Sequence, residues 1–439
     1  MLFDNYLNNE SLEECIITKN DYNEGFNDDL NYTSIPTNSL SQNILNKVKK
    51  ATVLLKSSFS IPNGKNNDVY ITSDVHADLE KLMYILYKAK IIDKYHKQDI
   101  YTFNVISKNF IFIIVGDIVD GKRGLGNEVE DSIGNIELLL HIFLFNLRLK
   151  ARQNNSEVRF TIGNHDWHTV VSARKDEELY NNYVHTSAKK YFINWEGRRN
   201  CLLPFYECCN YLIVSIGTEI ICVHGGFHNE YNDKFLELLI AIQERVDMEI
   251  SINMYFEPNM NHILNNNNGP LWTRFYSKGG ENDICNSVTE YIFKMIVVGH
   301  CPTDVCLSNN NYMGQIHKQI EYSSLDCTKG GCVLVGCEDN EGPHLAFVDI
   351  TMSRAFRPKN NNDIIETNRR GEILHLQHDE NLGGSRYYNH IMRKEVMNGD
   401  VTSITVWKNS YPEFKGGKTN KKKKNKQRLR RTRKVLRNI

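Results

Sequence analysis

Residues 110–120 read FIFIIVGDIVD, and this stretch says more about the fold class than any other part of the chain. Six consecutive apolar residues, rich in β-branched side chains, predict a buried strand within Asn109–Val115. Gly116 then permits a tight turn, and two carboxylates, Asp117 and Asp120, follow. The stretch therefore predicts a strand that delivers ligand-type side chains to one of its ends.

Four other segments have the same arrangement, with His, Asp or Asn directly after an apolar run. The five segments are Ser73-Asp74-Val75-His76, Gly116-Asp117-Ile118-Val119-Asp120, Gly163-Asn164-His165-Asp166, Val223-His224-Gly225-Gly226 and Gly299-His300-Cys301-Pro302. Each alone is compatible with an ordinary turn or helix cap. In an α/β sheet, however, the carboxyl ends of the strands converge on one crevice, so all five can face a common point. Oxygen and imidazole ligands without thiolates favour a catalytic site for Mn²⁺, Fe or Zn²⁺ over a structural zinc site.

Short apolar runs alternate with helix-length segments from Val69 onward. The expected strands are Val69–Thr72, Asn109–Val115, Val158–Ile162, Tyr211–Ile216, Glu219–Val223, Met295–Val298, Val333–Gly336, Leu345–Ile350 and Ile373–Leu376. The expected helices are Leu79–Ile92, Ile133–Ala151, Tyr183–Trp195, Asp233–Ile250 and Ile284–Phe293. An α/β first half and a strand-rich second half predict an α/β (α+β) fold, with a two-sheet β-sandwich core flanked by helices.

Composition divides the chain into four parts. Residues 1–65 are polar and Asn-rich, and we expect an extension of low order. Residues 66–380 form the predicted catalytic domain, and residues 381–414 a C-terminal segment that packs on it. Residues 415–439 hold 13 Lys/Arg and no Asp/Glu, so the zero net charge of the chain combines a body of −13 with a tail of +13. We expect this basic tail to be disordered.

The composition also excludes several classes of protein. With 439 residues, 41% of them hydrophobic, the chain can bury a sizeable core and is not disordered throughout. No run approaches the roughly 18 apolar residues of a transmembrane segment, and the first residues lack the pattern of a secretory signal. The eleven cysteines are odd in number and include no C-x-x-C pair, which favours reduced thiols. An intracellular protein, cytoplasmic or nuclear and not secreted, is expected.

The order of the blocks, D-x-H, G-D-x-x-D, G-N-H-D, H-G-G and G-H-x-P-T, resembles that of the calcineurin-like metallophosphoesterases, and among them the phosphoprotein phosphatases. The resemblance covers roughly residues 68–380. Gly299-His300-Cys301-Pro302 is similar to the G-H-T-P block of prokaryotic-type members, such as the phage lambda phosphatase and the Shewanella-like phosphatases. Broader metallophosphoesterases carry a second metal-ligating His where this chain has Pro302.

The resemblance implies two divalent metal ions, with Mn²⁺ favoured and Fe or Zn²⁺ as alternatives. It implies that Asp74, His76 and Asp117 hold the first metal, and that Asp117, Asn164, His224 and His300 hold the second. A hydroxide bridging the metals would attack phosphorus. His165 would be the general acid for the leaving group, oriented by Asp120.

Three arginines are predicted to bind the phosphate. The family usually has Arg directly after G-D-x-x-D, whereas here Gly121-Lys122 intervenes, so Arg123 is expected to act from a longer loop. Arg274, in the segment L-W-T-R, resembles a phosphate-clamping Arg of prokaryotic-type members, although a surface ion pair is the alternative. Arg354, in the segment M-S-R, is the third candidate. Asp166 replaces the commoner Glu after G-N-H.

The sequence thus predicts a metal-dependent hydrolase of phosphomonoesters, most simply a Ser/Thr-type protein phosphatase acting on a phosphorylated protein. Two alternatives stay open. One is a phosphohydrolase of nucleotides, dinucleoside polyphosphates or RNA ends, and the other is a weakly active scaffold that binds nucleic acid. Both would use the tail, whose basic density suits nucleic acid or another polyanion and also resembles a nuclear localisation signal. A solvated tail without a fixed partner is the third reading of residues 415–439.

Overall fold

The computed structural model describes a large central part of the chain and several separate segments. They are residues 9–26, 39–55, 60–62, 67–123, 127–128, 136–172, 177–184, 189, 191–192, 194–228, 233–249, 258–278, 288, 293–301, 333–336, 343–349, 371–379, 388, 390–397 and 400–408. All structural statements below concern these residues. The basic tail and Arg354 lie outside them.

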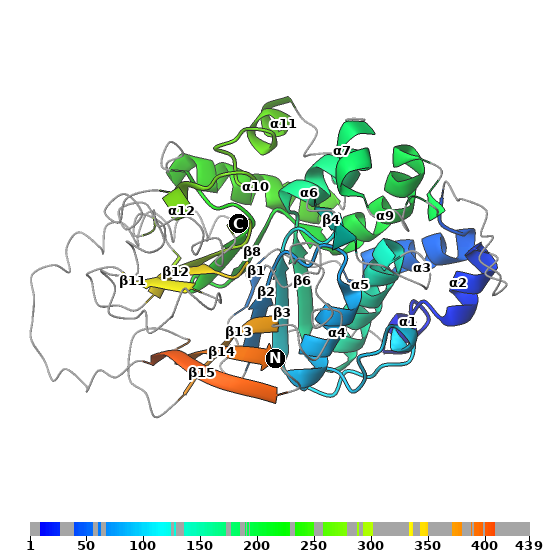
Figure 1. The fold of residues 1–439 in the computed structure, drawn as a ribbon, viewed down its shortest axis with the longest axis horizontal. Coiled ribbons are helices and arrows are strands. Elements are labelled where there is room, and N and C mark those ends of the chain that lie inside the picture. Colours follow the sequence, from blue (N-terminus) through cyan, green and yellow to red (C-terminus); the bar gives the residue numbers. More distant parts are fainter. Residues whose placement is uncertain are drawn as a thin grey trace, which may run out of the picture.

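Two mixed sheets form the centre of the described structure (Figure 1). The larger, seven-stranded sheet has the order β15 (Asp400–Lys408), β14 (His390–Met397), β13 (Gly371–Gln377), β2 (Asp68–Thr72), β3 (Phe110–Val115), β6 (Glu157–Thr161) and β7 (Asn210–Tyr211). Strands β2, β3, β6 and β7 run parallel, whereas β13, β14 and β15 continue the sheet in antiparallel fashion. The parallel strands therefore end at one edge, where the predicted ligands follow them.

The second sheet has six strands in the described residues. Its order is β1 (Ser60–Ile61), β8 (Ile213–Ile216), β9 (Ile220–Val223), β10 (Met295–Val298), β12 (Pro343–Phe347) and β11 (Val333–Gly336). Strands β9, β10 and β12 are parallel, so His224 and His300 again follow strands that end on the same side. A separate short hairpin joins β4 (Lys122–Arg123) to β5 (Asn127–Glu128).

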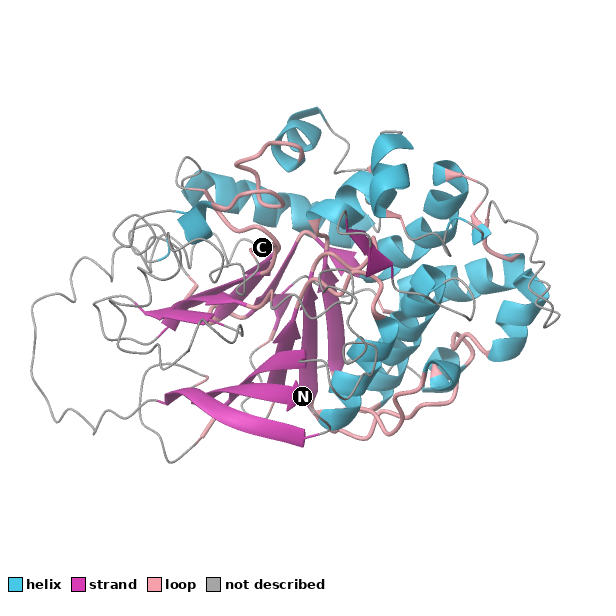
Figure 2. Ribbon diagram, viewed as in Figure 1, coloured by secondary structure: helices cyan, strands magenta, loops and turns pink. Residues whose placement is uncertain are grey.

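Helices cover both sheets (Figure 2). They are α1 (Asn9–Glu13), α2 (Lys19–Phe26), α3 (Gln42–Leu54), α4 (Leu79–Lys88), η1 (Lys97–Asp99), α5 (Ile136–Gln153), α6 (Asn164–Asp166), η2 (Trp167–Val171), α7 (Glu177–Tyr183), α9 (Trp195–Cys209), α10 (Asp233–Glu249), α11 (Pro258–Leu264) and α12 (Phe275–Lys278). Helix α5 packs on β6 and α4 on β13, while β6 also contacts β8 and α10 contacts β8. The layers are thus helix, sheet, sheet, helix, and the predicted two-sheet fold is confirmed.

Strand prediction was accurate for most of the apolar runs. Strands β2, β3, β6, β9, β10, β11 and β13 lie within a residue or two of their expected positions. The expected strand Tyr211–Ile216 is instead divided between the two sheets, because the Leu212 N–H donates to the Gln243 side chain at 2.7 Å and leaves the ladder. Strand β12 begins at Pro343 and ends at Phe347, short of the expected Ile350.

Helix prediction was less accurate. The expected helix Leu79–Ile92 ends at Lys88, because Lys90 adopts a left-handed backbone conformation with φ 61°. The expected helix Tyr183–Trp195 is not one continuous helix, because Tyr183 ends α7 and Trp195 begins α9. Between them, Lys189 and Tyr191 are helical, and residues 185–188, 190 and 193 lie outside the described residues. Most of the expected helix Ile284–Phe293 lies outside the described residues.

The low order expected for residues 1–65 is wrong for residues 9–26 and 39–55. Ile44, Val48 and Ala51 form one buried stripe of α3, at helical spacing. Ile17 is buried too, and the Asn146 side chain of α5 accepts from its N–H at 2.9 Å and donates to its carbonyl at 2.8 Å. The buried apolar residues of these segments are scattered among many polar ones, so the composition of residues 1–65 does not indicate that they pack.

Within the described segments, no helix combines the length and apolar character needed to cross a membrane. Five cysteines there, Cys15, Cys201, Cys208, Cys222 and Cys301, are buried free thiols.

Candidate metal centre

The ends of five strands bring the six predicted ligands together. Asp74, Asp117 and Asn164 follow β2, β3 and β6 of one sheet. His224 and His300 follow β9 and β10 of the other sheet. All six ligand side chains are buried, the most exposed being His300 at 7%. A cluster of this kind is assembled by the meeting of two sheets, and neither sheet alone supplies it.

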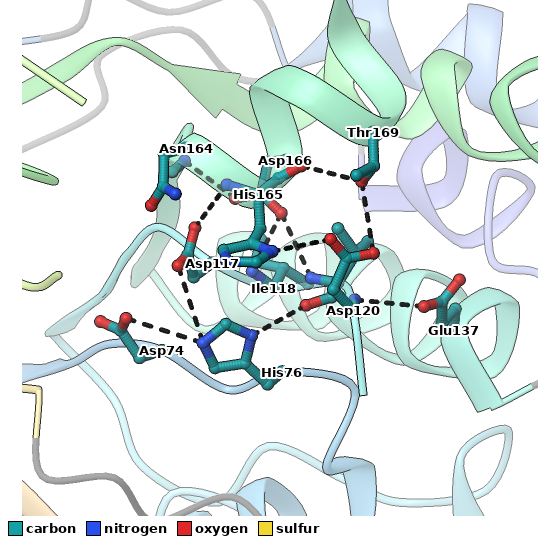
Figure 3. A network of polar contacts seen from close by, with 12 residues as sticks. Asp74, His76, Asp117, Ile118, Asp120, Glu137, Asn164, His165, Asp166 and Thr169 are labelled. Carbon is teal, nitrogen blue, oxygen red and sulfur yellow. Dashed lines mark hydrogen bonds and ion pairs between the residues drawn. The ribbon is translucent and has the colours of Figure 1, made fainter. Parts of the chain in front are cut away.

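Asp117 is shared by two triads of possible ligands. Asp74, His76 and Asp117 form one, and Asp117, His224 and His300 form the other. His76 Nε2 lies 3.6 Å from Asp117 Oδ2 (Figure 3). His224 Nε2 lies 3.4 Å from Asp117 Oδ1. These spacings exceed a good hydrogen bond but suit two donors that each lie about 2.0–2.2 Å from one cation. The donor set therefore fits a dinuclear site built around a bridging carboxylate.

Hydrogen bonds to backbone carbonyls fix the tautomers of the histidines. His76 Nδ1 lies 3.1 Å from the Val119 carbonyl, and His224 Nδ1 lies 2.8 Å from the Val115 carbonyl. Because a carbonyl only accepts, each Nδ1 carries a hydrogen, and each Nε2 faces the centre, where its lone pair can bind a cation that replaces any proton held there. His300 has the reverse arrangement, since its Nε2 contacts the Trp272 carbonyl at 3.2 Å and its Nδ1 remains for a metal.

The backbone at the centre is held in costly conformations. Asp74, His76, Asp117 and His300 all have positive φ, between 44° and 58°. Left-handed conformations cost non-glycine residues roughly 1–2 kcal/mol each, and such strain gathers where side chains must be aimed. Gly163 is required for a different reason, because a Cβ there would lie 2.2 Å from Asp117 Oδ1.

The electrostatics of the centre favour positive charge. Although burial works against it, the negative charge of Asp117 raises the pKa of His224 to about 10. Burial likewise opposes the ionised form of Asp117, yet the neighbouring histidines, His224 first, hold its pKa well below the usual range. Burial and the charge of His224 lower the pKa of His300 to about 3, which keeps that imidazole neutral as a ligand must be.

A second imidazole and carboxylate pair adjoins the predicted ligands. His165 Nδ1 lies 2.8 Å from Asp120 Oδ2, and the His165 ring stands edge-on to that of His76, with 5.2 Å between centroids. The His165 backbone N–H donates to Asp117 Oδ1 at 2.9 Å, which ties the pair to the bridging carboxylate (Figure 3). The structure thus brings His165 and Asp120 together as the sequence predicted.

Asp166 binds the two ligand-bearing turns to each other. It accepts hydrogen bonds from the N–H groups of Ile118, Val119 and Gly163, at 2.9, 3.2 and 2.9 Å. The Tyr206 hydroxyl donates to it at 2.7 Å. Burial, and then the charge of Asp117, raise the pKa of Asp166 to about 6. The carboxylate is therefore an anchor for the backbone of both turns.

The three predicted phosphate-binding arginines are placed unequally. Arg274 is exposed, and its charge is among the influences that lower the pKa of His300, so it lies within electrostatic reach of the centre. The backbone of Arg123 belongs to β4, but its side chain lies outside what the structure describes, and so does the whole of Arg354.

Several buried residues around the centre were missed by the sequence reading. Arg198 and Glu137 lie behind Asp120, and Tyr206 supports Asp166. Trp272, which the sequence analysis named only as part of the segment L-W-T-R, is partly buried; its ring lies 6.3 Å from that of His300 and edge-on to that of His168 at 4.7 Å. A charged residue within an otherwise apolar helix, such as Glu137 in IELLLHIFLF, was the available clue.

The family model for calcineurin-like phosphoesterases matches residues 68–304, which is more than half of the chain. The chain belongs to this family. The match spans all six predicted ligands and the His165–Asp120 pair, and the family uses a dinuclear site of divalent metal ions. The chain is accordingly a phosphoester hydrolase by family.

Among solved structures, two kinds of phosphatase resemble the chain. One is a cold-active protein-tyrosine phosphatase of a psychrophilic Shewanella species, at 19% identity and a TM-score of 0.48, covering 80% of this chain and 84% of that one. The other is a protein serine/threonine phosphatase from Saccharomyces cerevisiae with similarity to human phosphatase PP5, at 11% identity and a TM-score of 0.44, covering 80% of this chain and 88% of that one. No curated protein matches the chain.

Proposed function

We propose that the protein hydrolyses phosphomonoesters as a Ser/Thr-type protein phosphatase, with Mn²⁺ as the preferred metal. The observation that carries the proposal is the buried Asp117, shared by two ligand triads whose histidines are oriented by backbone carbonyls. Asp74 and His76 complete the first metal site. Asn164, His224 and His300 complete the second.

The donor chemistry supports a hard or borderline divalent metal. Three oxygens and three imidazole nitrogens, with no thiolate, suit Mn²⁺, and Fe or Zn²⁺ are the alternatives. Bound there, two cations supply charge neutralisation for the phosphate and lower the pKa of a water. Gly116 and Gly163 keep the strands close enough for the six side chains to meet.

His165 is the proposed general acid. Its Nδ1 is held by Asp120, which leaves Nε2 to deliver a proton to the departing alkoxide. An alkoxide from serine or threonine is a poor leaving group, so this proton matters more for it than for an activated phenolate. Arg274 is proposed to contact the phosphate, because it is exposed, its charge acts on His300, and its planar fork can hold two phosphate oxygens.

The decisive experiment measures hydrolysis of p-nitrophenyl phosphate and of bis(p-nitrophenyl) phosphate with added Mn²⁺, beside the Asp117→Asn variant. Turnover of the monoester that is lost in the variant supports the proposal. Preference for the diester would instead favour diester or nucleotide chemistry, and no metal-dependent turnover of either would contradict the proposal.

Substrate class is tested next, with matched peptides that carry phosphoserine, phosphothreonine or phosphotyrosine. The Ser/Thr assignment predicts a higher kcat/KM for the first two. Equal or better cleavage of phosphotyrosine would overturn that assignment while leaving the phosphomonoester chemistry intact.

A further inference from the structure

A buried arginine stands behind the proposed proton donor. Arg198 of α9 is fully buried, and its Nη2 donates to Asp120 Oδ1 at 2.7 Å. The other oxygen of the same carboxylate, Oδ2, faces His165 Nδ1 at 2.8 Å. Asp120 therefore lies between an arginine on one side and the imidazole on the other.

Arg198 is in turn fixed by a second carboxylate. Its Nε donates to Glu137 Oε2 at 2.7 Å, and its Nη2 is 3.0 Å from Glu137 Oε1. Glu137 Oε1 also accepts from the Asp120 backbone N–H at 3.1 Å, a contact drawn in Figure 3. The backbone and the side chain of Asp120 are thus tied to the same buried Arg–Glu pair, which comes from α9 and α5.

The remaining contacts of Asp120 are weaker. The Thr169 hydroxyl lies 3.4 Å from Asp120 Oδ1 and makes its shorter bond, of 2.8 Å, to the His165 carbonyl. A planar guanidinium that grips two carboxylates has little rotational freedom. Of the contacts to Asp120 Oδ1, the one with Arg198 is therefore the one able to fix the orientation of the carboxylate.

We propose that Arg198 is a positioning residue for phosphoester cleavage, which aligns Asp120 so that the His165 imidazole presents Nε2 to the leaving group. The expected kinetic effect rests on the proposed function. The alignment of Asp120 by Arg198 can be tested without any activity. Arg198 is buried away from solvent and acts only through Asp120.

The kinetic test compares the wild type with Arg198→Lys on a series of aryl phosphates, from 2,4-dinitrophenyl to unsubstituted phenyl phosphate. Lysine keeps the charge but cannot bridge both carboxylates with a planar fork. We expect kcat for phenyl phosphate to fall by about 10²-fold, a typical contribution of general acid catalysis, because phenolate needs the proton. For 2,4-dinitrophenyl phosphate, whose leaving group departs without a proton, kcat should change little.

Arg148→Lys is the matched control. Arg148 is equally buried, on α5, and donates to the Cys208 carbonyl at 2.6 Å. The same substitution there disturbs packing but should leave the dependence on the leaving group as in the wild type. An equal loss on all substrates in Arg198→Lys, or the same selective loss in Arg148→Lys, would overturn the inference.

A second readout does not depend on activity. In protein loaded with diamagnetic Zn²⁺, a His165 Nδ1 proton shared with buried Asp120 should give a far-downfield resonance in proton NMR, identified by its loss in His165→Gln. We expect it to move upfield or broaden in Arg198→Lys and to persist in Arg148→Lys, and an unchanged resonance in Arg198→Lys would contradict the inference. If the wild type cleaves no phosphomonoester, the proposed function fails while this measurement still decides the positioning.

Should Arg198→Lys fail to fold, Glu137→Gln tests the same point. Glutamine can still accept from the Asp120 N–H, but it loses the charge that fixes Arg198. A smaller loss with the same selectivity for poor leaving groups supports the inference, and an unselective loss opposes it.

Discussion

A buried cluster of charged side chains lies at each end of strand β6, and the two clusters have net charges of opposite sign. Beyond its carboxyl end, Asn164 Oδ1 lies 2.9 Å from His224 Nε2, beside the carboxylates of Asp74 and Asp117. With the imidazoles neutral, as metal ligands must be, these carboxylates leave an excess of negative charge. At the amino end of β6, Glu157 is surrounded by Arg148, Arg152 and Arg159, whose Nε atoms lie 3.4, 2.8 and 3.2 Å from its oxygens.

The net charge of each cluster is stabilised in a different way. At the amino end, neutral groups of the protein stabilise the excess positive charge of the arginines. Arg148 donates to the carbonyls of Cys208 and Leu55, and Arg159 donates to the Tyr211 hydroxyl. At the carboxyl end, hydrogen bonds to backbone carbonyls orient His76 and His224 so that each Nε2 faces the centre, where a bound metal cation would supply the positive charge. One cluster therefore serves the fold, and the other is built to bind cations.

The largest expected effect comes from Asp117→Asn. Removing the shared carboxylate should abolish binding of the metal pair and lower kcat by at least about 10³-fold, because several kcal/mol of charge stabilisation are lost. The metal-free variant should also lose some stability, because Asp117 is the counter-charge of His224 and accepts a hydrogen bond from the His165 N–H. Metal content by inductively coupled plasma mass spectrometry and thermal unfolding after chelation are the measurements. If the variant kept both its metal and its activity, the carboxyl-end cluster would not be the metal site, and the contrast between the two clusters would be wrong.

Glu157→Gln should have the opposite result. It leaves three buried arginines without their counterion, and breaking a buried ion pair costs about 3–5 kcal/mol of unfolding free energy. Denaturant unfolding should show this loss, while metal content and kcat per folded molecule stay at the wild-type level. A loss of metal in this variant would mean that the clusters are coupled through β6.

Arg274→Ala tests the exposed rim of the metal centre. Loss of a charge-assisted contact to phosphate, worth roughly 1.5–3 kcal/mol, should lower kcat/KM for a phosphomonoester by about 10- to 100-fold. Unfolding free energy should change little because the side chain is exposed. Arg274→Lys should recover part of the loss, and an unaffected kcat/KM would assign Arg274 to the surface ion pair instead.

The smallest effect concerns His141 of α5, which lies between Glu137 and Arg148 along the helix. Burial lowers its pKa to about 4. The unfolded state, with a pKa near 6.5, binds this proton more readily than the native state does, so stability should fall as the pH drops from about 6.5 toward 4. Urea unfolding of His141→Phe should show a shallower fall over that range, and an unchanged slope would show that other groups set it.

The sequence predicted the site better than the surroundings of the site. Candidate ligands such as Asp74 and His224 could be found because each directly follows an apolar run, so one local pattern indicates both the strand and the candidate ligand. Arg198 could not be found in this way. Its partners Glu137 and Asp120 are 61 and 78 residues away along the chain, and nothing local to Arg198 refers to either. The helices of residues 9–26 and 39–55 were missed for the same reason, because their stability comes from contacts with α5 and α9.

The sequence by itself determined the ligand types, their order, and the strands that present them, because strand formation and the turn after a strand depend on neighbouring residues. Only the tertiary structure decided which imidazole nitrogen faces the centre, and that Arg198 lies behind Asp120. It also decided that Glu157 and Asp117 occupy clusters of opposite charge. These features depend on burial and on partners distant in the chain, and the free energy of a buried charge is set by the groups that surround it in space.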